Sequence, residues 1–289
     1  MFGLLNINKP QGKTSRDAVN CVQRIVRPVK VGHAGTLDPL ATGVLVLGLG
    51  AATRLVEYVQ RMPKRYTATF LLGWRSDTED IEGAVIEVEN GQQPSRDQIL
   101  AKLPSFVGDI EQRPPAYSAV KIKGKRSYQL ARAGHEVHLE PRKITIYEIT
   151  LRQYVYPELT LEVQCGSGTY IRSLGRDLAE SLGTAAVMSS LVRTAIGNLT
   201  IDEALELEDV SVNSISKHLR PAADAVDCLS QVKLTDDEIG RISNGLAVEN
   251  RMNSPDAEMA AFDSTGKLVA ILTPKDSQQL RPTKVFLAS

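Results

Sequence analysis

The chain has 289 residues, with 34 Lys and Arg against 34 Asp and Glu, 42% hydrophobic residues and three cysteines. This composition is ordinary for a globular protein of one or two domains, and the balanced charge argues against a polycation. There is no apolar run of about 18 residues, no basic signal-peptide start and no zinc-ligand spacing of Cys and His, so we expect a cytoplasmic protein without a membrane or metal partner.

Basic residues are concentrated in two segments of the chain. Residues 1–66 hold ten Lys and Arg against three Asp and Glu, and residues 113–143 hold eight against two. If the two segments meet in the fold, they form the kind of positive surface that binds nucleic acid. If they do not meet, they are ordinary solvated faces, and charge alone does not decide between the two.

Apolar periodicity and turn residues predict a chain of mixed helices and strands. Ser15 is the expected N-cap of a helix that runs to about Val26, where Arg27-Pro28 ends it. Residues 226–289 have frequent turn signals and are expected to form short strands. Further helices are expected over 52–60, from Ser95 to about 103, from about 171 onward, and over 203–220. Strands are expected over 2–8, 43–50, 65–72, 84–88, 106–110, 144–154, 159–165 and 185–199.

One loop combines unusual backbone freedom with ionisable groups. Residues 31–45 read V-G-H-A-G-T-L-D-P-L-A-T-G-V-L and carry one carboxylate, Asp38, and one imidazole, His33. Taken alone, Asp-Pro in a glycine-rich loop is typical of a structural turn. The chain offers no second carboxylate at a telling spacing and no G-x-S-x-G nucleophile motif. A lone carboxylate that acts on a sugar-like centre, kept ionised by an arginine, fits better than a glycosidase or a serine hydrolase.

The basic segment 113–143 interleaves tyrosines with cations. Tyr117 and Tyr128 lie among Lys121, Lys125 and Arg126. Cations beside aromatic rings suit a surface that grips phosphates and stacks on bases. The alternative is an amphipathic loop and helix whose tyrosines pack inward.

Several sequence blocks, in order along the chain, resemble those of the TruB family of tRNA pseudouridine synthases. The resemblance covers about residues 1–225, and it favours a catalytic Asp38 over a structural turn. The blocks are K-P-Q-G-K-T-S near the start, H-A-G-T-L-D-P-L-A-T-G-V-L, K-R-Y at 64–66, L-G-W-R-S-D-T-E-D-I-E-G at 72–83, R-P-P-A-Y-S-A-V-K-I-K-G-K-R-S-Y at 113–128, G-T-Y-I-R at 168–172 and L-V-R-T-A-I-G at 191–197.

The resemblance implies an α+β pseudouridine synthase fold. This fold has a large mixed, mostly antiparallel sheet with flanking helices and a central cleft. Residues 1–225 would be the catalytic domain, with 113–143 as an RNA-gripping insertion, and 226–289 a small β-rich, PUA-like domain. The implied reaction converts uridine 55 in the T-loop of tRNA to pseudouridine, without cofactor or metal, and we expect a monomer.

The resemblance also assigns roles to single residues. Asp38 is expected to act at the sugar–uracil centre, by attacking C1′, attacking the uracil ring or removing a ribose proton. Arg172 is expected to pair with Asp38, and Tyr66 to stack on the flipped base. The remaining expected contacts to RNA or to the site wall are those of His33, Tyr170, Leu191, Asp80, Lys9 and Lys121. Asp80 would hold RNA, Arg172 or a neighbouring loop.

The chain departs from the family pattern in places, and two rival functions remain open. Gly166 replaces a frequent Ser, Ser76 replaces a usual Thr, and the acidic tail matches the family's C-terminal domains poorly, so we expect it mainly to pack on the catalytic domain. The first rival is a guide-dependent, dyskerin-like synthase. The second is a tRNA-binding folding chaperone in which catalysis is secondary.

Overall fold

A computed structural model describes residues 1–89, 91–118, 120–122, 124–252 and 256–286. Its largest feature is an eleven-stranded sheet in the order β14-β1-β3-β12-β4-β11-β10-β7, with β13, β15 and β2 paired to β12, β1 and β3. Among the described pairs of this sheet, β1–β14 and β3–β12 are parallel and the others antiparallel. The predicted α+β class with a mixed, mostly antiparallel sheet is confirmed. Its strands are β1 Gly3–Lys9, β2 Val31–His33, β3 Thr42–Leu49, β4 Lys64–Leu72, β7 Gly108–Gln112, β10 Arg142–Val155, β11 Glu158–Cys165, β12 Ala186–Ile196, β13 Leu199–Thr200, β14 Leu205–Glu206 and β15 Leu219–Arg220.

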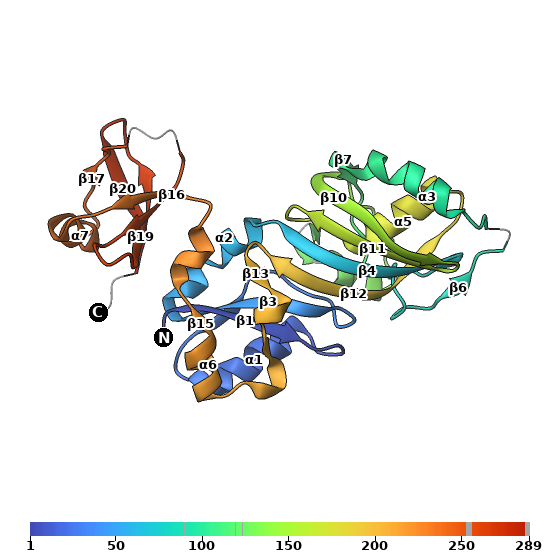
Figure 1. Cartoon of the computed structure of the whole chain (residues 1–289), viewed down its shortest axis with the longest axis horizontal. Helices are drawn as coiled ribbons and strands as arrows, with labels where there is room; N and C mark the ends of the chain where they lie inside the picture. Colours follow the sequence, from blue (N-terminus) through green and yellow to red (C-terminus); the bar gives the residue numbers. More distant parts are fainter. Residues whose placement is uncertain (90, 119, 123, 253–255, 287–289) are drawn as a thin grey trace.

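Helices cover this sheet at two places, and α3 and α5 lie over its β10–β11 end (Figure 1). Their apolar residues form one core cluster with β4, β10, β11 and β12, and α1 forms another with β1 and β3. None of the helices in the described ranges is long and apolar enough to cross a membrane. The α-helices are α1 Ser15–Val26, α2 Val56–Arg61, α3 Arg96–Lys102, α4 Ser127–Arg132, α5 Ile171–Ser181, α6 Val212–His218 and α7 Asp236–Ser243. The 3-10 helices are η1 Gly50–Arg54, η2 Leu103–Phe106, η3 Ile201–Glu203, η4 Leu207–Asp209 and η5 Ala222–Val226.

The expected N-cap at Ser15 is wrong by one residue. Thr14 caps α1, because its hydroxyl accepts from Asp17 N while the Asp17 carboxylate accepts from Thr14 N. This reciprocal capping box satisfies two free backbone donors at the helix start. The Ser15 hydroxyl is therefore available for a contact outside the helix.

Other expected elements are shifted or shortened. The helix expected over 52–60 is divided into η1 and α2, and the strand expected over 106–110 begins at Gly108 because η2 occupies the preceding residues. The strand expected over 84–88 is reduced to β6 Ile86–Glu87, which pairs with β5 Trp74–Arg75.

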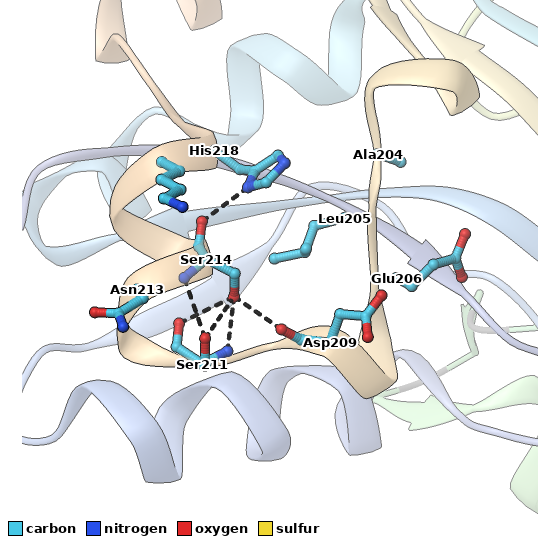
Figure 2. A pocket seen from close by; sticks show the side chains of 9 residues that line it. Ala204, Leu205, Glu206, Asp209, Ser211, Asn213, Ser214 and His218 are labelled. Atoms are coloured by element: carbon cyan, nitrogen blue, oxygen red, sulfur yellow. Dashed lines mark hydrogen bonds between the residues drawn. The ribbon is translucent and has the colours of Figure 1, made fainter.

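The continuous helix expected over 203–220 is wrong. Residues 205–206 instead pair with β1 as the short strand β14, and α6 begins only at Val212. Figure 2 shows the irregular segment opposite α6, with the Ser214 hydroxyl bonded to Ser211 and to the carbonyl oxygen of Asp209. These local bonds cap α6 and stop a helix from continuing through the segment.

Residues 230–285 form a second, five-stranded sheet in the order β16-β18-β19-β20-β17. The expected short strands are present, but the expectation missed α7, which Thr235 and Glu238 begin with a capping box. Figure 1 shows this sheet at the end of the molecule opposite α3 and α5. Its strands are β16 Ser230–Lys233, β17 Val248–Glu249, β18 Met259–Phe262, β19 Leu268–Pro274 and β20 Gln279–Val285.

The second sheet is docked on α2 by polar and apolar contacts. Tyr58 donates to Glu258 over 2.8 Å and accepts from Lys284 over 3.0 Å. Beside them the rings of Phe2 and Phe286 stack with centroids 5.4 Å apart. The tail thus packs on the rest of the chain, as expected.

Helix α5 approaches β4 through a glycine. A Cβ at Gly175 would lie 2.1 Å from a ring carbon of Phe70, a side chain with no exposed surface. Glycine at this position therefore sets how closely the helix lies on the sheet.

We predict that Gly175→Ala lowers the free energy of unfolding by about 2 kcal/mol, because the added methyl overpacks the contact with Phe70. The measurement is the midpoint of urea unfolding. Gly240→Ala is the matched control, since a Cβ at this helical glycine meets nothing within 4 Å. The control should be neutral or stabilising by up to about 1 kcal/mol. Equal effects of the two variants would contradict the prediction.

Candidate active site

The loop that carries Asp38 is fixed from both sides by backbone contacts. The Ser15 hydroxyl accepts from Leu37 N over 2.8 Å and donates to Leu37 O over 3.2 Å. Gly12 N donates to Pro39 O over 2.8 Å. The residues directly before and after Asp38 are therefore held by α1 and by the turn that precedes it.

Arg193 lies beneath the same loop and has 2% of its surface exposed. Its Nε donates to Val44 O over 2.7 Å, and its two Nη atoms reach the carbonyl oxygens of Thr36 and Gly35 over 3.5 Å. The loop approaches Arg193 closely because Gly43 has φ of +95° and a Cβ there would lie 2.3 Å from Arg193 O. A side chain at residue 43 would separate β3 from β12 and lift the loop.

Arg172 is the centre of the ionisable groups. Its Nη2 lies 3.0 Å from Asp38 Oδ2, and its Nη1 lies 3.4 Å from Asp80 Oδ2. The same two nitrogens donate to Thr78 O over 2.6 Å and to Tyr117 O over 3.1 Å. The Arg172 side chain is 8% exposed and that of Asp80 4%, whereas Asp38 is 40% exposed. Asp38 is thus the solvent-accessible carboxylate of an otherwise buried ionic network.

Tyr66 and Leu191 are buried on the paired strands β4 and β12. Tyr66 lies on β4, is 9% exposed, and shares a core cluster with Leu191, which is 7% exposed. Burial raises the pKa of the Tyr66 phenol, and the nearby Arg193 guanidinium opposes this shift. The phenol is therefore neutral at physiological pH.

Lys9 is completely buried close to Asp38. Its Nζ donates to Pro10 O over 2.9 Å and to Lys13 O over 2.7 Å. Burial lowers the pKa of Lys9 to about 8, and the negative charge of Asp38 acts in the opposite direction. The ammonium supports the turn before α1 and adds positive charge beneath the Asp38 loop.

His33 lies at the end of β2, and Tyr170 lies directly before α5. His33 is half-buried, and its Nδ1 has no hydrogen-bond partner among the described residues. Burial lowers the pKa of His33, which favours the neutral imidazole. Tyr170 is the N-cap of α5, and its backbone exchanges two hydrogen bonds with the Gln112 side chain, of 2.9 and 3.0 Å. The side chain of Lys121 lies outside the part of the chain that the structure describes.

The two basic segments meet at this site. The carbonyl of Tyr117, from the segment 113–143, and the carboxylate of Asp38, from the segment 1–66, both bind Nη2 of Arg172. After Tyr117 the segment forms the hairpin of β8 Lys121–Ile122 and β9 Lys125–Arg126, followed by α4. The Tyr117 contact joins residues 113–117, the root of the segment 113–143, to the centre of the ionic network.

Two residues that shape the site, Arg193 and Glu79, are not among those expected from the sequence. Arg193 lies within the block 191–197. The pattern that could have identified it is an arginine among the apolar residues of a strand. Glu79 lies within the block 72–83, and no local sequence pattern indicated its backbone conformation. The pocket of about 490 Å³ in Figure 2 is lined by residues 204–218 and contains none of the expected site residues. Across the described ranges, no group of three His, Cys, Asp or Glu is placed to hold a metal ion.

A family model described as TruB family pseudouridylate synthase (N terminal domain) matches residues 23–171. The chain belongs to the TruB family. A tRNA pseudouridine synthase B of Dehalococcoides mccartyi is 40% identical, covering 100% of this chain and 97% of that protein. The protein of the same name from Synechocystis is 39% identical over 99% of this chain and 100% of its own.

Solved structures with the same fold align with 99% of the chain. A chain of a Cbf5-Nop10-Gar1 complex superposes with a TM-score of 0.78 at 26% identity, covering 99% of this chain and 85% of that one. A chain of an H/ACA RNP bound to a substrate RNA gives a TM-score of 0.76 at 24% identity and supports the fold alone. The predicted pseudouridine synthase fold with a PUA-like C-terminal sheet is confirmed. The alignments with these two relatives extend through the tail.

We predict that Arg172→Met lowers the free energy of unfolding by about 3 kcal/mol, because it leaves the buried Asp80 carboxylate without its cation. Urea unfolding at pH 7 measures the loss. Arg152→Met is the matched control, since Arg152 pairs with Glu162 while 58% exposed. The control should lose less than about 1 kcal/mol. A loss for Arg172→Met no greater than that of the control would contradict a structural role for the network.

Proposed function

We propose that this chain converts uridine to pseudouridine in tRNA, and that its target is uridine 55 of the T-loop. The observation that carries the proposal is the partly exposed Asp38 carboxylate held 3.0 Å from the buried Arg172 guanidinium. The names of the full-length relatives in Dehalococcoides mccartyi and Synechocystis support the substrate class. A monomer that acts in the cytoplasm belongs to the same proposal.

The proposed reaction is an isomerisation in which atoms and electrons balance internally. The bond from C1′ to N1 breaks, the uracil turns, and a bond from C1′ to C5 forms. The proton on C5 is lost and N1 gains one, so no oxidant or reductant is consumed. Asp38 acts first by attacking C1′, attacking the uracil ring or removing a ribose proton.

The neighbouring side chains have distinct parts in this proposal. Arg172 holds the Asp38 carboxylate in place and aims it, because a guanidinium pairs with oxygen acceptors in a fixed plane. Tyr66 stacks on the flipped base, which has left its place between neighbouring bases and needs a new stacking surface. Asp80 fixes Arg172 from the buried side. Tyr170 and Leu191 line the uracil pocket, His33 contacts the displaced RNA, Lys9 supports the wall, and Lys121 with the segment 113–143 grips the T-arm.

The test of the substrate is incubation of the purified protein with an unmodified tRNA transcript, without added cofactor, followed by mapping of pseudouridine at each position. We predict a single pseudouridine at uridine 55. A product at another position would overturn the assignment of the site while leaving the reaction intact. An absence of pseudouridine would overturn the function.

We predict that Asp38→Asn removes pseudouridine formation and changes tRNA affinity by less than about tenfold, because phosphate contacts supply most of the binding energy. Single-turnover conversion and filter binding measure the two effects. Asp109→Asn is a matched control, since Asp109 lies on β7, where its carboxylate accepts from the Thr145 hydroxyl. Conversion by Asp38→Asn at the control's rate would refute the mechanism.

A guide-dependent synthase is the second candidate, and the fold likeness to the Cbf5-Nop10-Gar1 complex is what favours it. The segment 113–143 argues for a stand-alone enzyme, because it supplies cations and aromatic rings that can hold a tRNA arm directly. Activity of the purified protein on a bare T-arm stem-loop separates the two. Conversion there supports the stand-alone enzyme, and a strict need for a second RNA supports the guided one.

A further inference from the structure

The segment from Ser76 to Asp80 is bound to α5. Consecutive residues of this segment bind neighbouring residues of the helix. Arg172 contacts Thr78 O and the Asp80 carboxylate. Glu79, the residue between these two, points to the next residues of the helix, and its Oε2 accepts from the Ser173 hydroxyl over 2.7 Å. Its other carboxylate oxygen pairs with Arg176.

The backbone at Glu79 is in an unfavourable conformation. Its φ is +61°, in the left-handed region that residues other than Gly, Asn and Asp seldom adopt. The strain is maintained because Glu79 O accepts from Met188 N over 3.0 Å and Ile81 N donates to Met188 O over 3.1 Å. These bonds fix the segment on β12, so that the Glu79 and Asp80 side chains reach different residues of α5. Strain that the surroundings hold in place is characteristic of functional sites.

The Glu79 side chain also reaches the root of the RNA-gripping segment. Arg176, which it orients, donates from Nη2 to Arg113 O over 2.9 Å. Tyr117 O, four residues further along, binds Nη2 of Arg172. One carboxylate thus joins three parts: the segment that carries Asp80, the first turns of α5, and the start of the segment 113–143.

We propose that Glu79 is a positioning residue for catalysis, which acts through Arg172 by locking the segment 76–80 and the root of the segment 113–143 onto α5. The proposal rests on the proposed function. Glu79 is not assigned a contact with the reacting atoms, because its two carboxylate oxygens bind Ser173 and Arg176. Its loss should move Thr78 O and Asp80, and with them the guanidinium that aims Asp38.

The fold should tolerate removal of this carboxylate. Arg176 keeps a second acid, since its Nε and Nη2 lie 2.9 and 2.7 Å from Asp177 Oδ1. Glycine at residue 79 removes the clamp and also relieves the positive φ. Glu79→Gly therefore separates the loss of positioning from the loss of stability.

The test compares kcat, KM and the urea midpoint of Glu79→Gly, Glu79→Gln and Ser173→Ala on an unmodified tRNA transcript. We expect Glu79→Gly to lower kcat at least tenfold, with KM within threefold and the midpoint no lower than that of the unaltered protein, because small misplacements of catalytic groups are costly. Glu79→Gln retains one acceptor oxygen for Arg176, and its amide NH2 can donate to the Ser173 hydroxyl, so it should recover part of kcat. Ser173→Ala should lower kcat less than Glu79→Gly does.

Glu180→Gln is the matched control, because Glu180 lies on the same helix and lines the same pocket of about 450 Å³ as Glu79 and Arg176. It should leave kcat and KM unchanged. The proposal is overturned if Glu79→Gly keeps kcat within twofold, if only KM changes, or if Glu180→Gln has an equal effect. The unaltered protein is assayed first, so failure of the proposed function appears as absent conversion before any variant is compared.

Discussion

The buried guanidinium of Arg172 is the constraint on which the site depends. It binds two carboxylates and two carbonyl oxygens that come from three separate segments of the chain. A buried cation needs such partners, because an unsatisfied charge in the interior is costly. The same bonds that stabilise the charge also bring the Asp38 loop, the segment around Asp80 and the root of the basic segment together.

The sequence predicted the elements of the site better than their contacts. Arg172 was expected in the first turn of a helix and lies there, and the buried strand after the Asp38 loop was also expected. The partners Thr78 O and Tyr117 O could not be predicted, because they are backbone atoms 94 and 55 residues away from Arg172. Such bonds depend on how closely α5 approaches each segment, which no local pattern encodes.

The helix boundaries were predicted wrongly for a different reason. Local sequence signals were present, but they favoured different structures for the same residues. Thr14 and Ser15 are both good N-caps, and Asp17 at the third position after Thr14 decides between them. Thr235 followed by Glu238 is the same signal for α7, within a tail whose turn residues favoured strands. Over 203–220, polar composition suggested a helix, whereas pairing with the exposed edge of β1 made residues 205–206 a strand.

The docking of the tail has a consequence for the loop that carries Asp38. Ala34 and Val44, which flank this loop, share one apolar cluster with Ala260 and Ile271 of the second sheet. The expected boundary at residue 225 also falls inside η5, where Ala225 and Val226 have no exposed surface. A truncated chain that ended there would expose the underside of the loop to water. The tail thus helps to support the loop that carries Asp38.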